Sequence, residues 1–248
     1  SQMFTDDRLI LGVGRGAFAC EMALLDSPLE DSRDKFNESL EVLRALVSEE
    51  EVSWKGKYYN FESLTVMPRP MTKNGPPIMM AVLDPQGIYA CTKRGFHIMT
   101  TPLSGDNQLM LDQVDGFVRA KSELKDKGKD LTLSLSRVAY VAKNDSDRKE
   151  KLEMAYEYYS RFDNVFTGPG IVNNGMIEIL PRKQTIEELD QSILICSADE
   201  MIDKLSPYKE VGIDRVILNM NFGANHKDTM DSIQSFSEKV IPHFSTDA

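Results

Sequence analysis

The sequence is poor in cysteine and histidine, and this scarcity excludes several kinds of site. Its 248 residues include three cysteines (Cys20, Cys91 and Cys196) and three histidines. Widely separated cysteines in an odd number are typical of a reducing compartment rather than of a disulfide framework. Neither a CxxC pair nor an HExxH motif is present, which argues against a zinc site built by the protein. We therefore expect a cytoplasmic protein without a metal centre.

Long apolar runs and an excess of basic residues are also missing. The longest uninterrupted apolar run, 78–83, is far shorter than the roughly 20 residues of a membrane-spanning helix. The first residues carry no signal-peptide pattern. Against 29 basic residues stand 39 acidic ones, for a net charge of −10. Such a field repels phosphate backbones. We therefore expect neither a membrane nor a nucleic acid as a partner.

The sequence does have an alternation of short apolar segments and amphipathic stretches. The apolar segments predict five strands, at 8–14, 78–82, 96–100, 131–142 and 215–220. The amphipathic stretches predict helices at 27–50, 85–94, 106–127, 145–162, 197–211 and 229–244. Residues 52–61 predict a hairpin. Strands that alternate with helices in this way indicate an α/β protein with a parallel sheet.

Two helix starts and one long connection have clear local signatures. Ser27-Pro-Leu-Glu30 and Ser197-Ala-Asp-Glu200 both match a capping box, in which the side chains at the two ends bond each other's backbone N–H. Residues 163–192, by contrast, lack clear periodicity. A connection of that length inside a compact domain is usually a lid or a binding loop.

A glycine-rich turn follows the first predicted strand. Gly12–Ala17 matches the GxGxxA dinucleotide fingerprint, but that fingerprint opens a helix at once, and here the next helix begins more than ten residues later. A tight turn accounts for the glycines equally well. It does not account for Arg15, a cation at the carboxyl end of a strand, which is the active-site face of an α/β barrel. A structural ion pair is the alternative role for Arg15.

Eight stretches of the chain, taken in order, resemble the bacterial luciferase-like flavin monooxygenases. They are Arg8–Phe18, Asp31–Arg33, Gly56–Asn60, Pro68–Pro70, Pro76–Ala81, Lys93–Phe96, Ser197–Glu200 and Val240–Phe244. The resemblance implies a TIM (β/α)8 barrel of the luciferase-like type. Because the matching begins at the family's fourth strand, it also implies that the first three βα units are missing from this chain.

The length of the chain suggests a complete barrel, but the number of predicted strands does not. About 250 residues suit a complete barrel, but five strands cannot close one. We therefore expect residues 1–248 to form a single barrel domain that is incomplete at its N-terminus, with 163–192 as a lid insertion. Such a chain is either shortened or completed by another polypeptide. The alternative is a natural short homologue that binds flavin without oxygenase activity. The family's usual catalytic histidine lies on the missing part, so no catalytic residue is assigned.

The resemblance also implies a cofactor, partners and site residues. The cofactor is reduced FMN supplied by a separate flavin reductase, and with O2 it oxidises an aldehyde, a ketone or another small organic substrate. The deazaflavin F420 is the alternative cofactor, and a homo- or heterodimer is expected. The flavin phosphate falls on Arg15 and Arg33, with help from Ala17. The remaining phosphate contacts are Leu83, Asp84, Gln86 and Gly87, at the start of the following helix.

For three residues the sequence also allows a purely structural role. Arg33 lies in the first turn of a predicted helix, where a surface role fits it at least as well. Asp84 stands where family members often have a serine or threonine, and an acid beside a phosphate is unfavourable unless it points away. His97 lies inside a predicted strand, which favours a core role over catalysis.

Overall fold

The computed structural model describes residues 2–25 and 29–245. The chain forms two compact units, residues 1–81 and 82–248, which are described in turn. Among the described residues, no helix is both long and apolar enough to cross a membrane.

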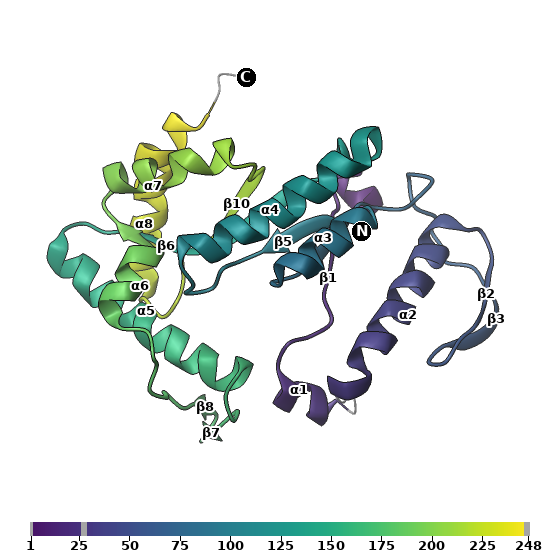
Figure 1. Cartoon of the computed structure of the whole chain (residues 1–248), viewed down its shortest axis with the longest axis horizontal. Coiled ribbons are helices and arrows are strands. Elements are labelled where there is room, and N and C mark those ends of the chain that lie inside the picture. Colours follow the sequence, from purple (N-terminus) through teal and green to yellow (C-terminus); the bar gives the residue numbers. More distant parts are fainter. Residues whose placement is uncertain (1, 26–28, 246–248) are drawn as a thin grey trace. The chain divides into compact units, whose positions relative to one another are not determined.

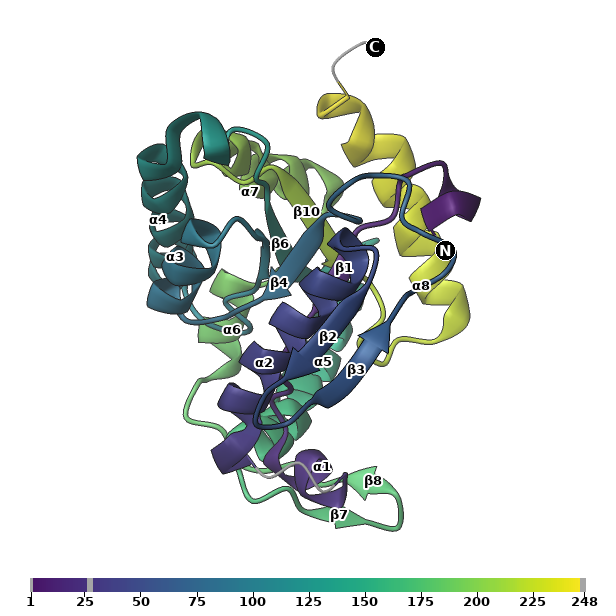
Figure 2. The ribbon, with the colours of Figure 1, turned by 90° about the vertical axis from the view of Figure 1, so that its right-hand side faces the viewer.

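The first unit consists of a pair of parallel strands, two helices and a hairpin. Strand β1 (Leu11–Val13) pairs in parallel with β4 (Ile78–Ala81). Between them come the following elements: α1 (Ala19–Leu24), α2 (Leu29–Ser48), β2 (Val52–Lys55) and β3 (Asn60–Leu64). A short 3-10 helix, Gln2–Thr5, precedes β1. Figure 2 shows the β2–β3 hairpin running alongside α2.

A single carboxylate of α2 holds this hairpin by its turn. Glu38 accepts hydrogen bonds from the backbone N–H groups of Tyr58 and Tyr59, each at 3.0 Å, and from the indole Nε1 of Trp54 at 3.1 Å. A Cβ at Gly56 would collide with that carboxylate, so the turn closes around it only because residue 56 has no side chain. The hairpin is therefore fastened to the helix by polar contacts at its tip.

The second unit is built around the long strand β6 (Leu133–Val141). It pairs in parallel with β5 (His97–Thr100), β10 (Arg215–Asn219) and β9 (Leu194–Cys196). Its helices are α3 (Pro85–Lys93), α4 (Asn107–Leu124), α5 (Asp145–Phe166), α6 (Ile186–Ser192), α7 (Ala198–Glu210) and α8 (His226–Ser235). A short hairpin, β7 (Val172–Asn173) and β8 (Met176–Ile177), lies between α5 and α6. In Figure 1, α3 and α4 lie side by side.

The core of the second unit lies on both faces of β6. Leu133, Leu135 and Ala139 are fully buried on one face. On the other, Tyr140 packs into a cluster with residues of α5, α6 and β9, and its ring meets the edge of Phe222 at a centroid distance of 6.2 Å. Because β6 is covered on both sides, even its polar residues Ser134 and Arg137 are buried, and Val138–Val141 is a continuous apolar run.

The expected fold class is confirmed, and so are the five predicted strands. The parallel pairing of strands separated by helices is that of an α/β protein. The strand β9 was not predicted, nor was the helix α1. The closing helix begins at His226 rather than 229, and continues as a π-helical turn over Phe236–Val240 and a 3-10 turn over Ile241–His243.

The segment 163–192 is more structured than its sequence suggested. It contains the end of α5, the β7–β8 hairpin and α6, so the lack of periodicity in its sequence does not mean a lack of regular structure. Of the two predicted capping boxes, Ser197 does accept a bond from the N–H of Glu200 at 3.2 Å, but without the reciprocal bond. Ser27 lies outside the described residues. A complete capping box, which was not predicted, joins Thr185 and Glu188.

Candidate functional site

The loops at the carboxyl ends of the parallel strands form the edge of the second unit where ligands are expected. In open and closed α/β sheets alike, ligands bind beyond the carboxyl ends of the strands. Loops 101–106, 142–144 and 220–225 leave this edge after β5, β6 and β10. The segment 82–84 leads into α3.

A buried glutamine of α4 braces two of these segments. Gln113 is 1% exposed, and its Nε2 donates to the carbonyl oxygens of Leu83 at 2.8 Å and Thr101 at 3.0 Å. One side chain thus fixes the backbone before α3 and the backbone after β5. The start of α3 is therefore held in place.

A second set of contacts fastens the segment before β9 to the loop after β5. The carbonyl oxygen of Ser104 accepts from Gln184 Nε2 at 2.7 Å and from Ser192 Oγ at 3.3 Å. The hydroxyl of Ser104 accepts from Arg182 Nη2 at 2.7 Å. We call these four residues the Ser104 clasp. Because its members come from segments about 80 residues apart, it fixes the end of the 163–192 segment to the site edge.

Aromatic and charged groups bury the guanidinium of the clasp. The Arg182 side chain is 4% exposed, its Nε lies 3.0 Å from Asp163 Oδ2, and its Cζ lies 5.4 Å from the centre of the Tyr159 ring. The Tyr159 hydroxyl donates to the carbonyl oxygen of Leu103 at 3.2 Å. Burial raises the pKa of Tyr159 to about 12, although the guanidinium of Arg137 acts in the opposite direction. Tyr159 therefore stays protonated near neutral pH and cannot act there as a base.

The β7–β8 hairpin projects from this segment on a firm base. The side chain of Asn164, fully buried in α5, donates to the carbonyl oxygens of Ile171 and Glu178 and accepts from the N–H of Ile171, each at 2.9 Å. At the tip, Asn174 and Gly175 have φ of 50° and 77°, as a type I′ turn requires. Apolar side chains on the hairpin face water, and Met176 is 61% exposed. A shallow cleft of about 450 Å³ lies beside it, lined by Arg161, Asn173 and residues 176–179.

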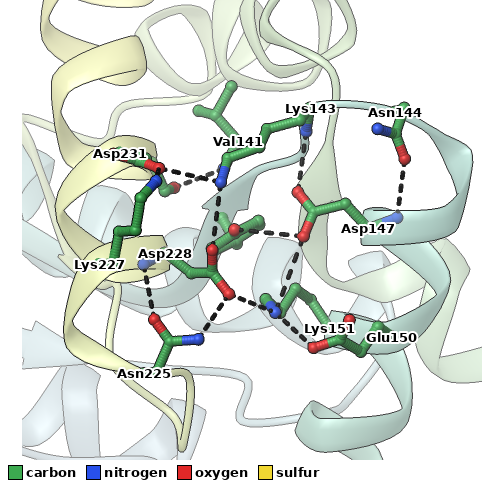
Figure 3. A network of polar contacts seen from close by, with 12 residues as sticks. Val141, Lys143, Asn144, Asp147, Glu150, Lys151, Asn225, Lys227, Asp228 and Asp231 are labelled. Carbon is green, nitrogen blue, oxygen red and sulfur yellow. Dashed lines mark hydrogen bonds and ion pairs between the residues drawn. The ribbon is translucent and has the colours of Figure 1, made fainter.

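A network of charged side chains lies at the same edge, beyond the carboxyl ends of β6 and β10 (Figure 3). The first turns of α5 and α8 meet there, and Lys151, 1% exposed, points its Nζ at Asp228 (3.0 Å) and Glu150 (2.7 Å). Lys143 contacts Asp228 at 3.1 Å and Asp231 at 2.9 Å. Hydrogen bonds from the two lysines lower the pKa of Asp228 to about 2. The carboxylates of the two helices are thus paired with the chain's own lysines.

In the first unit, the structure places Arg15 beside a helix that also carries Arg33. Arg15 is exposed, and its Nη1 donates to Ser32 Oγ at 3.0 Å. Among the described residues, neither Arg15 nor Arg33 forms an ion pair, so the alternative of a structural ion pair has no support there. Gly16 has a φ of +92°, which only glycine adopts easily, and it turns the backbone between Arg15 and exposed Ala17.

In the second unit, the predicted residues 83–87 form the start of α3. Asp84 is the N-cap, and its Oδ2 accepts from the N–H of Gly87 at 2.7 Å. The carbonyl oxygen of Leu83 accepts a hydrogen bond from Gln113 Nε2 of α4. Gln86 is exposed in the first turn. The carboxylate of Asp84 therefore takes the position at the helix N-terminus where the sequence suggested a phosphate.

His97 lies away from the carboxyl edge. It is the first residue of β5, its Nδ1 lies 2.9 Å from Thr132 Oγ1, and it accepts from the N–H of Thr132 at 3.2 Å. Burial, together with the nearby charge of Arg215, lowers its pKa. A neutral histidine at the amino end of a strand fits the structural role favoured by the sequence.

Sequence reasoning missed the residues that shape the edge. Gln113, Asn164 and Arg182 each act on partners distant in the sequence, and no local pattern marks them. The hairpin did carry a signal, since Asn-Gly between apolar pairs is a strong predictor of a type I′ turn. So did Thr185 and Glu188, with capping-box spacing.

Comparisons with known proteins found a family model and several distant relatives that match most of the chain. A family model described as luciferase-like monooxygenase matches residues 2–215. The oxygenase component of flavin-dependent trigonelline monooxygenase from Acinetobacter baylyi is 23% identical, over 99% of this chain and 70% of that protein. The F420-dependent glucose-6-phosphate dehydrogenase of Amycolatopsis mediterranei is 22% identical, over 97% of this chain and 71% of that protein. A monooxygenase structure from Streptomyces bottropensis shares the fold, with a TM-score of 0.73 and 21% identity, over 96% of this chain and 69% of that chain.

Proposed function

Because the chain belongs to the luciferase-like monooxygenase family, an enzyme family of the TIM-barrel fold, we propose that it is a flavin-dependent monooxygenase. It would use reduced FMN and O2 to oxidise a small organic substrate such as an aldehyde or a ketone. The likeness to the trigonelline monooxygenase supports this proposal. Since that relative is an oxygenase component, we also propose a separate flavin reductase as a partner. From the family resemblance we further propose a homo- or heterodimer.

The observation that carries the proposal is the exposed guanidinium of Arg15. It follows β1 at the carboxyl end, is oriented by Ser32, and has no carboxylate partner among the described residues. A chain of net charge −10 repels a phosphate unless local cations attract it, and a guanidinium offers paired donors for phosphate oxygens. We assign the FMN phosphate to Arg15, with Arg33 and the backbone at Ala17 as further contacts.

The start of α3 fits a phosphate less well. Its N-terminus is already capped by Asp84, whose carboxylate holds the N–H of Gly87. Backbone groups at residues 83–87 therefore offer fewer donors than the family resemblance suggested. In this proposal the phosphate depends mainly on the cations of the first unit.

The residues at the carboxyl edge of the second unit would have structural roles rather than react. When bound, reduced FMN would supply the electrons for the reaction with O2. The Ser104 clasp and the β7–β8 hairpin would limit the access of water. We propose the hairpin as the lid, because apolar Val172 and Met176 are 52% and 61% exposed on it.

Titration of the protein with FMN, under reducing and oxidising conditions, tests the proposal. Arg15→Ala should weaken FMN binding by about 1.5–3 kcal/mol, the range for a hydrogen bond to a charged group, or roughly 10- to 150-fold in Kd. Arg119→Ala is the control, because Arg119 is an exposed arginine of α4 that pairs with its neighbour Asp115 on the same helix and lies over the ring of Tyr89. Equal FMN affinity in both variants would contradict the phosphate assignment.

An F420-dependent oxidoreductase is the second candidate function. The dehydrogenase from Amycolatopsis mediterranei matches this chain over 97% of its length, about as fully as the trigonelline relative does. The same titration with F420 separates the two candidates. A third possibility, a flavin-binding subunit without turnover, would show flavin binding but no NAD(P)H-linked oxygen consumption when a reductase is added.

A further inference from the structure

The hydroxyl of Ser32 links the first turn of α2 to the turn that follows β1. Ser32 is 4% exposed, and its Oγ accepts a hydrogen bond from Arg15 Nη1 at 3.0 Å. Because a guanidinium only donates, the proton of the hydroxyl is available for another partner, and it is donated to the carbonyl oxygen of Leu29 at 2.7 Å. The backbone of α2 therefore sets the direction of the lone pairs that face Arg15.

This hydrogen bond restrains a side chain that has considerable freedom. Arg15 is exposed and stands between Gly14 and Gly16, and Gly16 has a φ of +92°. In the part of the chain that the structure describes, the Arg15 side chain makes no other hydrogen bond and no ion pair. A long side chain such as arginine loses much rotamer freedom when it is fixed. Without Ser32, that loss would accompany the binding of a ligand.

The hydrogen bond to Ser32 orients the cation without neutralising it. A hydroxyl carries no charge, and it takes up one of the several N–H donors of the guanidinium. The remaining donors stay available for the oxygens of a phosphate. A carboxylate at the same place would also hold Arg15, but it would cancel the positive charge that attracts the phosphate.

We propose that Ser32 is a positioning residue for the flavin phosphate and acts through Arg15. This inference rests on the proposed function, which assigns the FMN phosphate to Arg15. Ser32 restricts the guanidinium before the ligand arrives, so less rotamer freedom is lost on binding. The hydroxyl itself does not bind the phosphate, because its proton is donated to Leu29.

A double-mutant cycle between the two residues tests this inference. The unchanged protein, Ser32→Ala, Arg15→Ala and the double variant, each as the full chain, are titrated with FMN and with riboflavin, which lacks the phosphate. The control is Ser39→Ala. Ser39 is also a partly buried serine of α2, and its Oγ donates to the carbonyl oxygen of Lys35 at 2.7 Å, but its other partner is the hydroxyl of Tyr59. Its loss removes a similar contact without an effect on a cation.

We expect Ser32→Ala to raise the Kd for FMN about 3- to 10-fold, since the freed arginine must then be ordered on binding. The Kd for riboflavin should stay the same. When Arg15 is already alanine, the loss of the serine hydroxyl should have no further effect on FMN binding. Ser39→Ala should change neither Kd.

A loss of FMN affinity in Arg15→Ala but not in Ser32→Ala would refute the role of Ser32 and leave the phosphate assignment standing. An effect of Ser32→Ala that persists without Arg15, or that is equal for riboflavin, would also refute it, since the serine would then act directly or through the fold. Unchanged FMN affinity in Arg15→Ala would overturn the phosphate assignment, and the inference with it. The same holds if the unchanged protein binds neither flavin.

Discussion

We predict that the side chain of Asn164 holds the β7–β8 hairpin in a fixed position. It is fully buried and makes three hydrogen bonds to the two ends of the hairpin, at Ile171 and Glu178. Each such bond adds about 0.5–1.5 kcal/mol to stability. Asn164→Ala should therefore weaken the attachment of the hairpin by roughly 2–4 kcal/mol, after some recovery by water.

Hydrogen exchange of the Ile171 amide measures this effect directly, because that N–H is donated to Asn164. A loss of about 2 kcal/mol or more corresponds to an exchange rate that is at least roughly 30-fold faster, when the amide exchanges by local opening. The global unfolding midpoint should change much less, since the hairpin lies outside the apolar core. Limited proteolysis within 167–181 should accelerate in parallel.

The control for this experiment is Asn173→Ala, in β7 next to the turn of the same hairpin. The Asn173 side chain is exposed and bonds the side chain of Glu178, so its loss leaves the base intact. If the Ile171 amide exchanged equally fast in both variants, the argument that Asn164 holds the hairpin would be refuted. The hairpin would then have to be held by Arg161, which donates to the carbonyl oxygen of Ile177.

Two further predictions concern polar contacts that fix local structure. Partial burial raises the pKa of the Glu38 carboxyl, but the N–H groups of the hairpin turn outweigh it and hold the pKa below the ordinary value of about 4.3. The ionised Glu38 therefore stabilises the folded protein fully above that value, and this stabilisation is lost as the pH falls through the lowered pKa. The midpoint of urea unfolding, followed by the fluorescence of the only tryptophan, should decrease over that pH range. It should not decrease there in Glu38→Gln. Arg182→Lys keeps a charge in the Ser104 clasp but loses the planar donors that reach Ser104. Thermal unfolding should therefore show a decrease of about 1–3 kcal/mol in the free energy of unfolding. For Arg119→Lys on the surface, that free energy should change by less than about 0.5 kcal/mol. An Arg182→Lys protein as stable as that control would show that charge alone holds the clasp.

The strands could be predicted from the sequence because each is a run of apolar residues bounded by turn residues. Ile78–Ala81 follows two prolines, and Arg215–Asn219 follows the Gly212 turn, so both stand out locally. Strand β9 has only three residues, Leu194–Cys196, which is too short for a periodicity to show. What makes it a strand is its pairing with β6, a long-range contact that no local pattern contains.

The roles of Arg182 in the Ser104 clasp and of Gln113 in α4 could not be predicted from the sequence for a related reason. Arg182 reads as an ordinary surface arginine until Ser104 and the tyrosines of α5 are placed around it. Gln113 is likewise one polar residue in an amphipathic helix, yet it is 1% exposed and holds two loops. Buried polar residues take their roles from their partners. A single sequence shows the residue but not the partner.

Asp84 shows how the local structure at a residue can be predicted correctly while its ligand stays a prediction. The pair Asp84-Pro85 is a strong local signal for a helix start, and α3 does begin there. Family resemblance put a phosphate at the same place, where relatives often carry a hydroxyl. A hydroxyl caps a helix and leaves room for an anion, whereas a carboxylate caps the helix and is itself the anion. The change of one side chain thus keeps the fold and alters what the helix end can bind. Residue positions therefore carry over between relatives more safely than ligands do.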